Sequence, residues 1–352
     1  MGMKKIIFDC ERMKYPHTGL YHFCHQLGNA LRENAEENQA QLSFYVRASE
    51  QSAFGENANY IAQHSLHKFW LPSTRKYQVW HATYQGTQYY PYHRRIKIIL
   101  TIHDLNFLYD EHKPEHKKLR EIKKLQQKIN RADHIVAISE FTKNDILTHL
   151  NTRKKPVSVI YNGCNFNHIG TPVRPENAPE GDFLYTIGTI TDKKNFHVLP
   201  CLLQHNNLKL VISGIHQSQT YTDKIMAEAN RWGVADRVVF TGSVSENDKQ
   251  WYISHCRAFL FPSLAEGFGL PVIEAMHFGK AVILSTRTAL PEIGGDCAYY
   301  FQDFEPATMQ KTLEESLLHF DQAGDVEKIK NRARFFSWKN AANQYLRLYE
   351  SI

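Results

Sequence analysis

Residues 266–275 read EGFGLPVIEA and combine two carboxylates with glycines and a proline, a set suited to binding a phosphorylated sugar. Pro271 fits the first turn of a helix, which leaves the glycines in the loop before it. There the backbone can approach a ligand closely, and N–H groups at the helix N-terminus favour a diphosphate. Carboxylates accept hydrogen bonds from pairs of hydroxyls. We therefore expect Glu266, in the loop, and Glu274, in the first turn, to reach one polyhydroxylated ligand.

The same segment resembles a motif of the retaining GT-B glycosyltransferases of family 4, also called glycosyl transferases group 1, in which seven residues separate the two glutamates. In that family the first glutamate contacts hydroxyls of the donor sugar, and the second holds the ribose of the nucleotide. The resemblance implies these roles for Glu266 and Glu274. It also implies that the backbone of Phe268, Gly269 and Leu270 supports the sugar or the phosphates. A solvated glutamate beside a helix cap would not explain so long a match.

A second matching segment, residues 188–195, reads GTITDKKN and follows a β-branched run. Many members of the family have an arginine where this chain has Thr189, so the segment resembles the polysaccharide-building subgroup with G-T-x-x-x-R-K-N. The resemblance implies that Lys193 and Lys194 neutralise the departing diphosphate, with Thr189 and Asn195 as further donor contacts. Adjacent lysines in a loop are usually only solvated, so this interpretation depends on their place after a strand.

Single residues in other loops complete the implied donor site. Gly214 follows a predicted strand, and Val244 lies in a segment whose backbone borders the base in relatives. Gly19 lies in a loop that meets the donor phosphates in the family. This loop lacks Gly-x-Gly-x-x-Gly, which argues against a dinucleotide cofactor. The residues of these loops either contact the ligand or only form the turns, and the sequence favours the two roles equally.

The catalytic residues implied by the resemblance are His103, Lys194 and Glu266. His103 closes a buried strand at a place where the family has a histidine beside the transferred sugar. Without the resemblance, a lone histidine at a strand end would more often be structural.

An aromatic loop at residues 81–92 reads HATYQGTQYYPY. Its Tyr84 and Tyr89 are suited to stacking on the face of an acceptor sugar. The alternative is a cluster of rings that only pack against one another.

Short β-branched runs alternate with helical segments, which predicts an α/β chain with two doubly wound parallel sheets. Ligands of such sheets bind beyond the carboxyl ends of the strands. The strands predicted in the first half are 4–9, 41–46, 78–81, 97–103, 134–138 and 157–161. Those predicted in the second half are 183–187, 208–213, 238–241, 258–261, 281–285 and 298–301. The resemblance implies the GT-B fold, two Rossmann-like domains facing across a cleft.

Asn162-Gly163 and a proline-containing stretch at 171–181 indicate a linker between the domains. We predict an N-terminal acceptor-binding domain at 1–168 and a C-terminal nucleotide-sugar donor-binding domain at 169–334. A final helix at 335–352 is expected to pack back on the N-terminal domain, as in relatives.

The charge is unevenly distributed along the chain. Residues 1–165 carry 24 Lys and Arg against 15 Asp and Glu, a net +9, whereas residues 166–352 carry 18 against 21, a net −3. Much of the excess lies on a helix predicted within residues 113–128, which could bind anionic lipid or a phosphorylated acceptor. A solvated helix face is the equal alternative. Nucleic acid is a poor fit, because no recognised binding motif accompanies the charge.

Localisation and metal use are predicted from what the sequence lacks. The six scattered cysteines are typical of a reduced compartment, and neither a membrane-spanning stretch nor a secretory signal is evident. We expect a cytoplasmic protein that is peripheral at the inner face of the membrane. No Asp-x-Asp pair occurs, so lysines and helix N-termini are expected to stabilise the leaving nucleotide without a metal. No cofactor is expected, since the nucleotide-sugar donor is a substrate.

The implied reaction is retaining transfer of a hexose to a glycan or lipid-linked acceptor in surface polysaccharide or lipopolysaccharide synthesis. The Gly-Thr and Lys-Lys-Asn pattern resembles mannosyltransferases and favours mannose from GDP-mannose. A transferase that uses a UDP-sugar, and a GT-B nucleotide-sugar epimerase or hydrolase, are the alternatives. A catalytically silent nucleotide-sugar binding protein fits poorly, because His103, Lys194 and Glu266 are all present.

Overall fold

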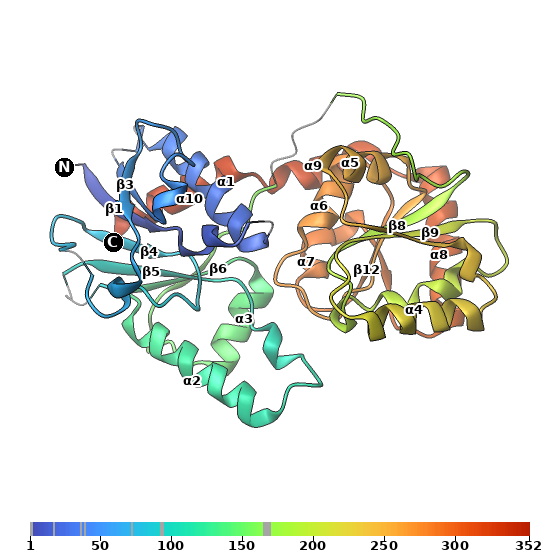
Figure 1. The fold of residues 1–352 in the computed structure, drawn as a ribbon, viewed down its shortest axis with the longest axis horizontal. Helices are drawn as coiled ribbons and strands as arrows, with labels where there is room; N and C mark the ends of the chain where they lie inside the picture. The colour runs from blue at the N-terminus through green and yellow to red at the C-terminus, as the bar shows by residue number, and fades with distance from the viewer. Residues whose placement is uncertain are drawn as a thin grey trace. The chain divides into compact units, whose positions relative to one another are not determined.

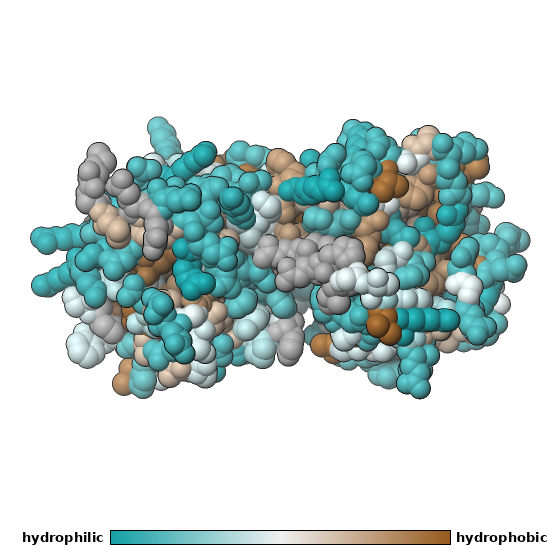
Figure 2. Space-filling model, turned by 90° about the horizontal axis from the view of Figure 1, so that it is seen from above, coloured by the Kyte–Doolittle hydropathy of each residue, from teal (hydrophilic) through white to brown (hydrophobic). Residues whose placement is uncertain are grey.

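The computed structural model describes residues 3–16, 18–35, 37–38, 40–71, 73–91, 95–164 and 170–352. The chain forms two compact units, one of Met1–Asn165 with Phe336–Ile352 and one of Phe166–Phe335. Each unit is a parallel sheet covered by helices (Figure 1). The surface in view in Figure 2 is largely hydrophilic, with hydrophobic side chains in small patches. The boundary predicted between residues 168 and 169 lies outside the described residues.

The first unit is built on a seven-stranded sheet with the order β3-β2-β1-β4-β5-β6-β7. Its strands are β1 (Lys4–Asp9), β2 (Ala40–Val46), β3 (Asn59–Ala62), β4 (Val79–Ala82), β5 (Lys97–Ile102), β6 (His134–Ala137) and β7 (Val157–Val159). All pairs are parallel, with Ile6 of β1 beside Leu42 on one side and Val79 on the other. The strand order reverses between β1 and β4, which is where such sheets bind ligands.

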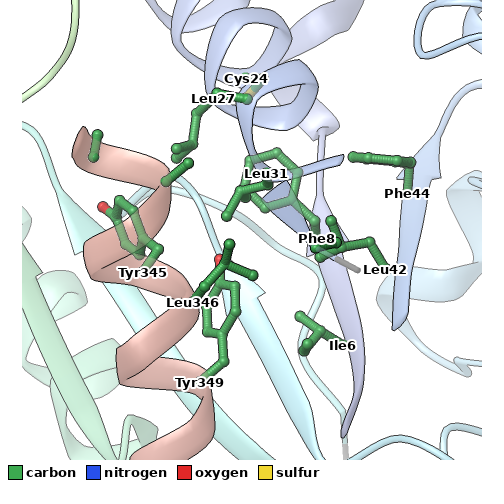
Figure 3. Close-up of a cluster of buried hydrophobic side chains, with 14 of the residues drawn as sticks. Ile6, Phe8, Cys24, Leu27, Leu31, Leu42, Phe44, Tyr345, Leu346 and Tyr349 are labelled. Carbon is green, nitrogen blue, oxygen red and sulfur yellow. The ribbon is translucent and has the colours of Figure 1, made fainter. Parts of the chain in front are cut away.

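Helices cover both faces of this sheet (Figure 1). They are α1 (Gly19–Asn34), α2 (Glu115–Arg131), α3 (Glu140–His149) and α10 (Trp338–Ser351), with short 3₁₀ helices η1 (Glu11–Lys14), η2 (Ala48–Glu50), η3 (Ser65–Lys68) and η4 (Asn106–Leu108). Alternate residues of a strand face opposite sides. Phe8 therefore packs with α1 and α10 (Figure 3), whereas Ile7 belongs to the core cluster that includes α2 and α3.

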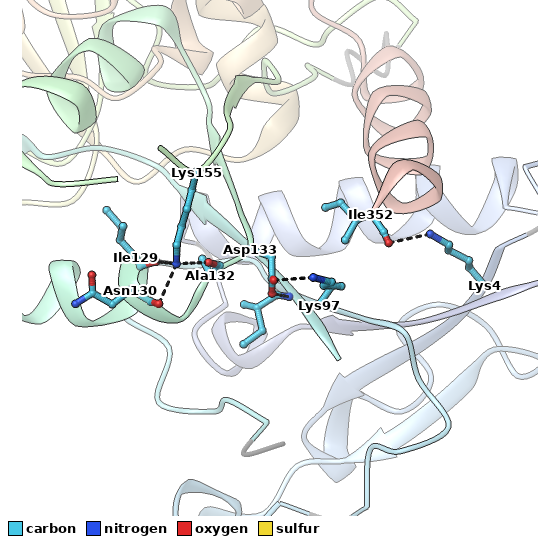
Figure 4. A network of polar contacts seen from close by, with 9 residues as sticks. Lys4, Lys97, Ile129, Asn130, Ala132, Asp133, Lys155 and Ile352 are labelled. Atoms are coloured by element: carbon cyan, nitrogen blue, oxygen red, sulfur yellow. Dashed lines mark hydrogen bonds and ion pairs between the residues drawn. The ribbon is translucent and has the colours of Figure 1, made fainter. Parts of the chain in front are cut away.

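The helix α10 belongs to the first unit although it ends the chain. Lys4 at the start of β1 donates hydrogen bonds to the backbone carbonyls of Tyr349, Glu350 and Ile352. Figure 4 shows the contact with Ile352. In the interior, the Tyr349 hydroxyl lies 2.7 Å from Nδ1 of His81. The helix α10 is thus held by polar contacts with β1 and β4, and by hydrophobic packing against β1.

The second unit is built on a six-stranded parallel sheet with the order β10-β9-β8-β11-β12-β13. Its strands are β8 (Phe183–Ile187), β9 (Lys209–Ser213), β10 (Val238–Gly242), β11 (Ala258–Phe261), β12 (Val282–Ser285) and β13 (Tyr299–Phe301). Its helices are α4 (Gln219–Arg231), α5 (Glu246–His255), α6 (Leu270–His277), α7 (Leu290–Gly294), α8 (Pro306–Ala323) and α9 (Val326–Phe335), with 3₁₀ helices η5 (Asp192–Lys194), η6 (Phe196–Val198), η7 (Pro200–Leu203), η8 (Ala235–Arg237) and η9 (Gly295–Cys297). The strand order reverses between β8 and β11.

Every predicted strand is present, most with ends shifted by one or two residues, and the α/β prediction is confirmed. The strand that the sequence analysis missed is β3. It has the sequence NYIA, lies at the sheet edge and is partly exposed along its length. A short edge strand without a buried face lacks the apolar run from which the others were predicted. Among the described helices, none is both long and apolar enough to cross a membrane.

Candidate active site

In the second unit, the two predicted donor motifs lie at the point where the strand order reverses. The loop at 188–195 follows β8 and the loop at 262–269 follows β11, and these strands are neighbours in the sheet. Parallel strands have their carboxyl ends at the same edge of the sheet, so both loops start there. The chain then continues from the two loops in opposite directions along the sheet, which leaves space between them for a ligand. Sequence-distant residues therefore meet at this edge.

A short polar contact at this edge joins Lys194 and Glu266. Lys194 Nζ lies 2.6 Å from Glu266 Oε1, and the two side chains are only 15% and 13% exposed. Burial would raise the pKa of Glu266, but Lys194 and then Lys193 outweigh it and hold the pKa below its usual range. The carboxylate is thus ionised at neutral pH, and can accept hydrogen bonds from sugar hydroxyls.

Glycines at 188 and 214 let the loops after β8 and β9 lie close together. A Cβ at Gly188 would lie 2.9 Å from Lys194 Cε. A Cβ at Gly214 would lie 1.9 Å from the Gly188 carbonyl oxygen, so no other residue allows the two loops to approach as they do. Packing alone explains Gly214, and a donor contact there stays a prediction.

The other residues of the first motif have different environments. Asn195 is buried and adopts a left-handed conformation with φ 58°, and its Nδ2 has no hydrogen-bond partner among the described residues. Thr189 and Lys193 are exposed. Of the two lysines, it is therefore Lys194 that is turned toward a motif glutamate.

The first turn of α6 begins without a side-chain cap among the described residues. Its N-cap is Gly269, with φ 109°, a conformation that favours glycine. Leu270 begins the helix, and Phe268 before it is buried. Pro271 has no N–H, and the Val272 N–H donates to the Gly269 carbonyl at 3.0 Å. The Leu270 N–H and the helix dipole therefore give this turn the partial positive charge that suits a phosphate.

Glu274 lies in the second turn of α6, because the helix begins at Leu270, so its predicted place in the first turn is wrong. Its Oε1 lies 2.8 Å from Lys249 Nζ on α5, and the same Nζ lies 2.9 Å from Glu246 Oε2. Burial raises the pKa of Glu274, although Lys249 acts in the opposite direction. Burial also disfavours the charged form of Lys249, yet its two carboxylate partners raise its pKa overall.

Sequence reasoning missed Lys249. The sole sequence signal is the i, i+3 spacing of Glu246 and Lys249 on a helix that begins just after Val244. Val244 is partly buried in the loop before α5. Nothing in the local sequence indicates that this lysine reaches across to α6.

In the first unit, His103 lies just beyond β5 and is 8% exposed. Its Nε2 lies 2.8 Å from the Thr83 carbonyl oxygen, and its ring meets Phe23 edge to face. Burial lowers the pKa of His103, and the hydrogen bond to Thr83 opposes this shift. The ring is therefore neutral at pH 7 with its proton on Nε2, which leaves Nδ1 as an acceptor.

A carboxylate that sequence reasoning missed lies at the strand reversal of this unit. Asp9 ends β1 and is 1% exposed. Its Oδ1 accepts the Glu11 N–H at 2.9 Å, and its Oδ2 accepts the Thr87 hydroxyl at 2.8 Å. Burial, and next the nearby Glu11, raises the pKa of Asp9 to about 7. Asp9 thus joins the loops that follow β1 and β4.

The predicted acceptor residues have unequal surroundings. The Arg12 guanidinium lies 4.7 Å from the centre of the Tyr84 ring, which is partly exposed. Tyr89 is 5% exposed and packs against Tyr45 in the core, so its ring supports the loop and offers no open face. Gly19 is the exposed first residue of α1, with open space beside it.

Two basic residues of α2 hold the aromatic loop. Lys128 donates to the Thr87 carbonyl and lies over the Tyr90 ring, and Arg131 donates to the Pro91 carbonyl. Lys128 is therefore not part of a solvated face. Lys117, Arg120, Lys123 and Lys124 are exposed, with Lys124 paired to Glu121.

Among the described residues, no group of three His, Cys, Asp or Glu side chains is placed to hold a metal ion. Metal-independent transfer stays a prediction.

Comparison with known proteins gives a consistent result over the whole chain. The family profile Glycosyltransferase Family 4 matches residues 22–168, and the profile Glycosyl transferases group 1 matches residues 173–323. O-antigen chain mannosyltransferase B of Escherichia coli is 24% identical over 390 residues, which cover 99% of this chain and 100% of that protein.

Solved structures show the same fold. Sucrose-phosphate synthase from Thermosynechococcus elongatus matches with a TM-score of 0.75 at 17% identity, covering 99% of this chain and 98% of that one. Anabaena HepE in complex with UDP and glucose matches with a TM-score of 0.74 at 16% identity, covering 99% and 100%. The chain therefore belongs to the GT-B glycosyltransferases, with a Glycosyltransferase Family 4 domain followed by a Glycosyl transferases group 1 domain.

Proposed function

We propose that this glycosyltransferase moves mannose from GDP-mannose, with retention of configuration, to a glycan or lipid-linked acceptor in O-antigen-type polysaccharide synthesis. The observation that carries the transfer activity is the partly buried Lys194–Glu266 ion pair at the strand reversal of the second unit. The choice of mannose is supported by the full-length similarity to an O-antigen chain mannosyltransferase.

In this reaction the bond from the sugar C1 to the diphosphate breaks, and the acceptor oxygen bonds to C1 on the same face. The acceptor proton passes to the departing phosphate oxygen. Lys194 meets the negative charge that grows on the diphosphate, with the first turn of α6 as a second positive region. Glu266 positions the sugar through its hydroxyls, and Glu274 holds the ribose. Lysines and backbone N–H groups supply the neutralisation, and no metal is required.

On the acceptor side, His103 presents its Nδ1 to the transferred sugar and Tyr84 contributes to acceptor binding. The protein works in the cytoplasm at the inner face of the membrane. The exposed Lys117, Arg120 and Lys123 of α2 attract anionic lipid or a phosphorylated acceptor.

The test is a thermal-shift screen of GDP-mannose against UDP-sugars, followed by transfer assays with and without excess chelator. A donor at a hundred times its dissociation constant stabilises the fold by about 2.7 kcal/mol. We expect a shift with GDP-mannose and chelator-insensitive transfer. A shift with UDP-glucose alone would favour the second candidate, a UDP-sugar transferase, which the likeness to HepE with UDP and glucose supports. Free sugar or an epimer formed without acceptor would contradict transfer.

A further inference from the structure

The segment between β3 and β4 exposes an aromatic pair that the proposed reaction does not use. Phe69 and Trp70 are each 80% exposed, the highest values among the large hydrophobic side chains that the structure describes. Leu66, which begins the same turn, is 63% exposed. Contiguous exposed apolar side chains of this size indicate an interaction surface.

The turn that carries the pair is fixed at both ends. The N–H groups of Phe69 and Trp70 both donate to the Leu66 carbonyl at 2.9 Å. Before them, His67 Nδ1 lies 2.9 Å from the hydroxyl of the buried Tyr45. After them, Leu71 is buried in the hydrophobic core. The two aromatic rings are therefore held out from the surface by an anchored backbone.

Along the chain, the Asp, Glu, Lys and Arg residues on both sides of the pair have one sign of charge. Between Glu56 and Asp104 the sequence contains no Asp or Glu. The same stretch contains six basic residues, Lys68, Arg75, Lys76, Arg94, Arg95 and Lys97. Arg75 and Lys76 are exposed. A second copy of this chain would bring two such stretches together and would be repelled, whereas an anionic surface would be attracted.

Aromatic rings beside basic side chains match the chemistry of a bilayer surface. Trp and other aromatic side chains favour the headgroup region, and each nearby Lys or Arg is drawn to anionic lipid. We propose that Leu66, Phe69 and Trp70 form an anchor that inserts into the interface of an anionic membrane, with Lys68, Arg75 and Lys76 binding its headgroups.

The place of the anchor in the unit agrees with a lipid-linked acceptor. Tyr45, to which His67 is bonded, lies near the carboxyl end of β2. The ring of Tyr89, in the loop after β4, packs against Tyr45 with ring centres 5.5 Å apart. The anchor is thus connected through one buried tyrosine to the loop that carries Tyr84. It deepens the proposed function, on which it rests only for the identity of the acceptor.

The test is flotation with vesicles of phosphatidylcholine alone or with phosphatidylglycerol, at low and high salt. We expect the protein to float with the anionic vesicles at low salt. Replacing both rings (Phe69→Ser with Trp70→Ser) should weaken binding at least tenfold. The matched control is Leu318→Ser, because Leu318 is 58% exposed on α8 of the other unit, and it should bind as the wild type does. Trp70→Phe should still bind but should lose the vesicle-induced blue shift of tryptophan fluorescence.

Three outcomes with the wild type and the double variant would overturn the anchor. They are wild-type protein that ignores anionic vesicles at low salt, a double variant that binds normally, and a concentration-dependent dimer that the double variant loses. Charge reversal on α2 (Lys117→Glu with Lys123→Glu) separates the anchor from the basic helix. Loss of binding in that variant alone would also contradict the anchor. Flotation needs neither donor nor acceptor, so these results stand apart from the proposed transfer. An unchanged circular dichroism spectrum reports that each variant is folded.

Discussion

Each glutamate of the donor motif is paired with its own lysine, but the net pKa shift of the carboxylate differs between the two pairs. Lys194 comes from the loop after β8 and meets Glu266, whereas Lys249 comes from α5 and meets Glu274. The pKa of Glu266 is held below its ordinary value, but that of Glu274 stays above it even with its partner present. The ionised fraction of Glu274 therefore starts to fall at a higher pH than that of Glu266.

Lys194→Ala should lower kcat by roughly a hundredfold, the size found when one preorganised charge-stabilising group is removed. The effect falls on kcat more than on donor affinity, because charge on the diphosphate grows in the transition state. Losing this partner also raises the pKa of Glu266, so the acid limb of the pH–rate profile should move to higher pH. Initial rates over a pH series test both effects, with the exposed Lys224→Ala as control. An unchanged kcat and profile would show that the pair is not catalytic.

Lys249→Met should weaken nucleotide binding most at low pH. Burial already raises the pKa of Glu274, and removing Lys249 raises it further. Only the ionised carboxylate accepts hydrogen bonds from both ribose hydroxyls, so affinity should recover as the pH rises. Calorimetry with GDP between pH 6 and 8.5 measures this, and Lys249→Arg should restore the wild-type profile. A loss of affinity that is equal at every pH would indicate a structural role alone.

Asp9→Asn should change how stability depends on pH. The pKa of Asp9 is about 7 in the folded chain, against 3.8 for the ordinary group. Between these values the folded chain keeps a proton that the unfolded chain releases, so this group's contribution to the free energy of unfolding falls as the pH rises. The asparagine variant lacks this loss. The unfolding free energy of the variant minus that of wild type should therefore rise between pH 4 and pH 8, by about 4 kcal/mol at most. Urea unfolding at several pH values tests the sign, and a constant difference would contradict it.

At the scale of elements, the hydrophobic pattern of the sequence predicts the strands well, but not the contacts between elements. The twelve predicted strands are rich in apolar and β-branched residues, and all are present. The position of β3 depends on pairing with β2, which a four-residue segment with exposed ends does not reveal. The motif residues Lys194 and Glu266 were found in sequence, but Lys249 and Asp9 were not. Their roles arise from contacts between α5 and α6, and between the loops after β1 and β4, that only tertiary structure creates.

The helix α10 closes a buried polar chain whose loss should destabilise the first unit. His81 Nδ1 meets the Tyr349 hydroxyl at 2.7 Å, and its Nε2 meets the Thr101 hydroxyl at 2.8 Å. Burial lowers the pKa of His81 to about 3, so the ring stays neutral. Tyr349→Phe leaves a buried ring nitrogen without a partner and should cost about 1–3 kcal/mol of unfolding free energy. Urea denaturation measures this, and the exposed Tyr15→Phe should change it by less than about 0.5 kcal/mol. Equal effects of the two variants would contradict the network.

At the scale of the whole molecule, the two units divide both charge and chemistry. The first carries the basic excess, the anchor segment and His103. The helix α10 belongs to this unit and packs on its sheet. The second is a continuous stretch of chain that contains both motif glutamates and both of their lysines. One hydrophobic cluster of this unit is made of residues between Leu184 and Leu313. A unit with its own core and a continuous chain should fold independently.

Residues 170–335 expressed alone should therefore fold and bind GDP. Ribose and diphosphate contacts are assigned to Glu274, Lys194 and the first turn of α6, all within this stretch. We expect a dissociation constant within about tenfold of that of the full chain, a difference of about 1.4 kcal/mol that leaves room for a phosphate contact from Gly19. Transfer should be absent, because His103 and Tyr84 are missing. Circular dichroism and calorimetry provide the measurement, with Glu274→Ala in the same fragment as control. A folded fragment that does not bind GDP would show that nucleotide recognition depends on the first unit, and an unfolded one would contradict the independence of its core.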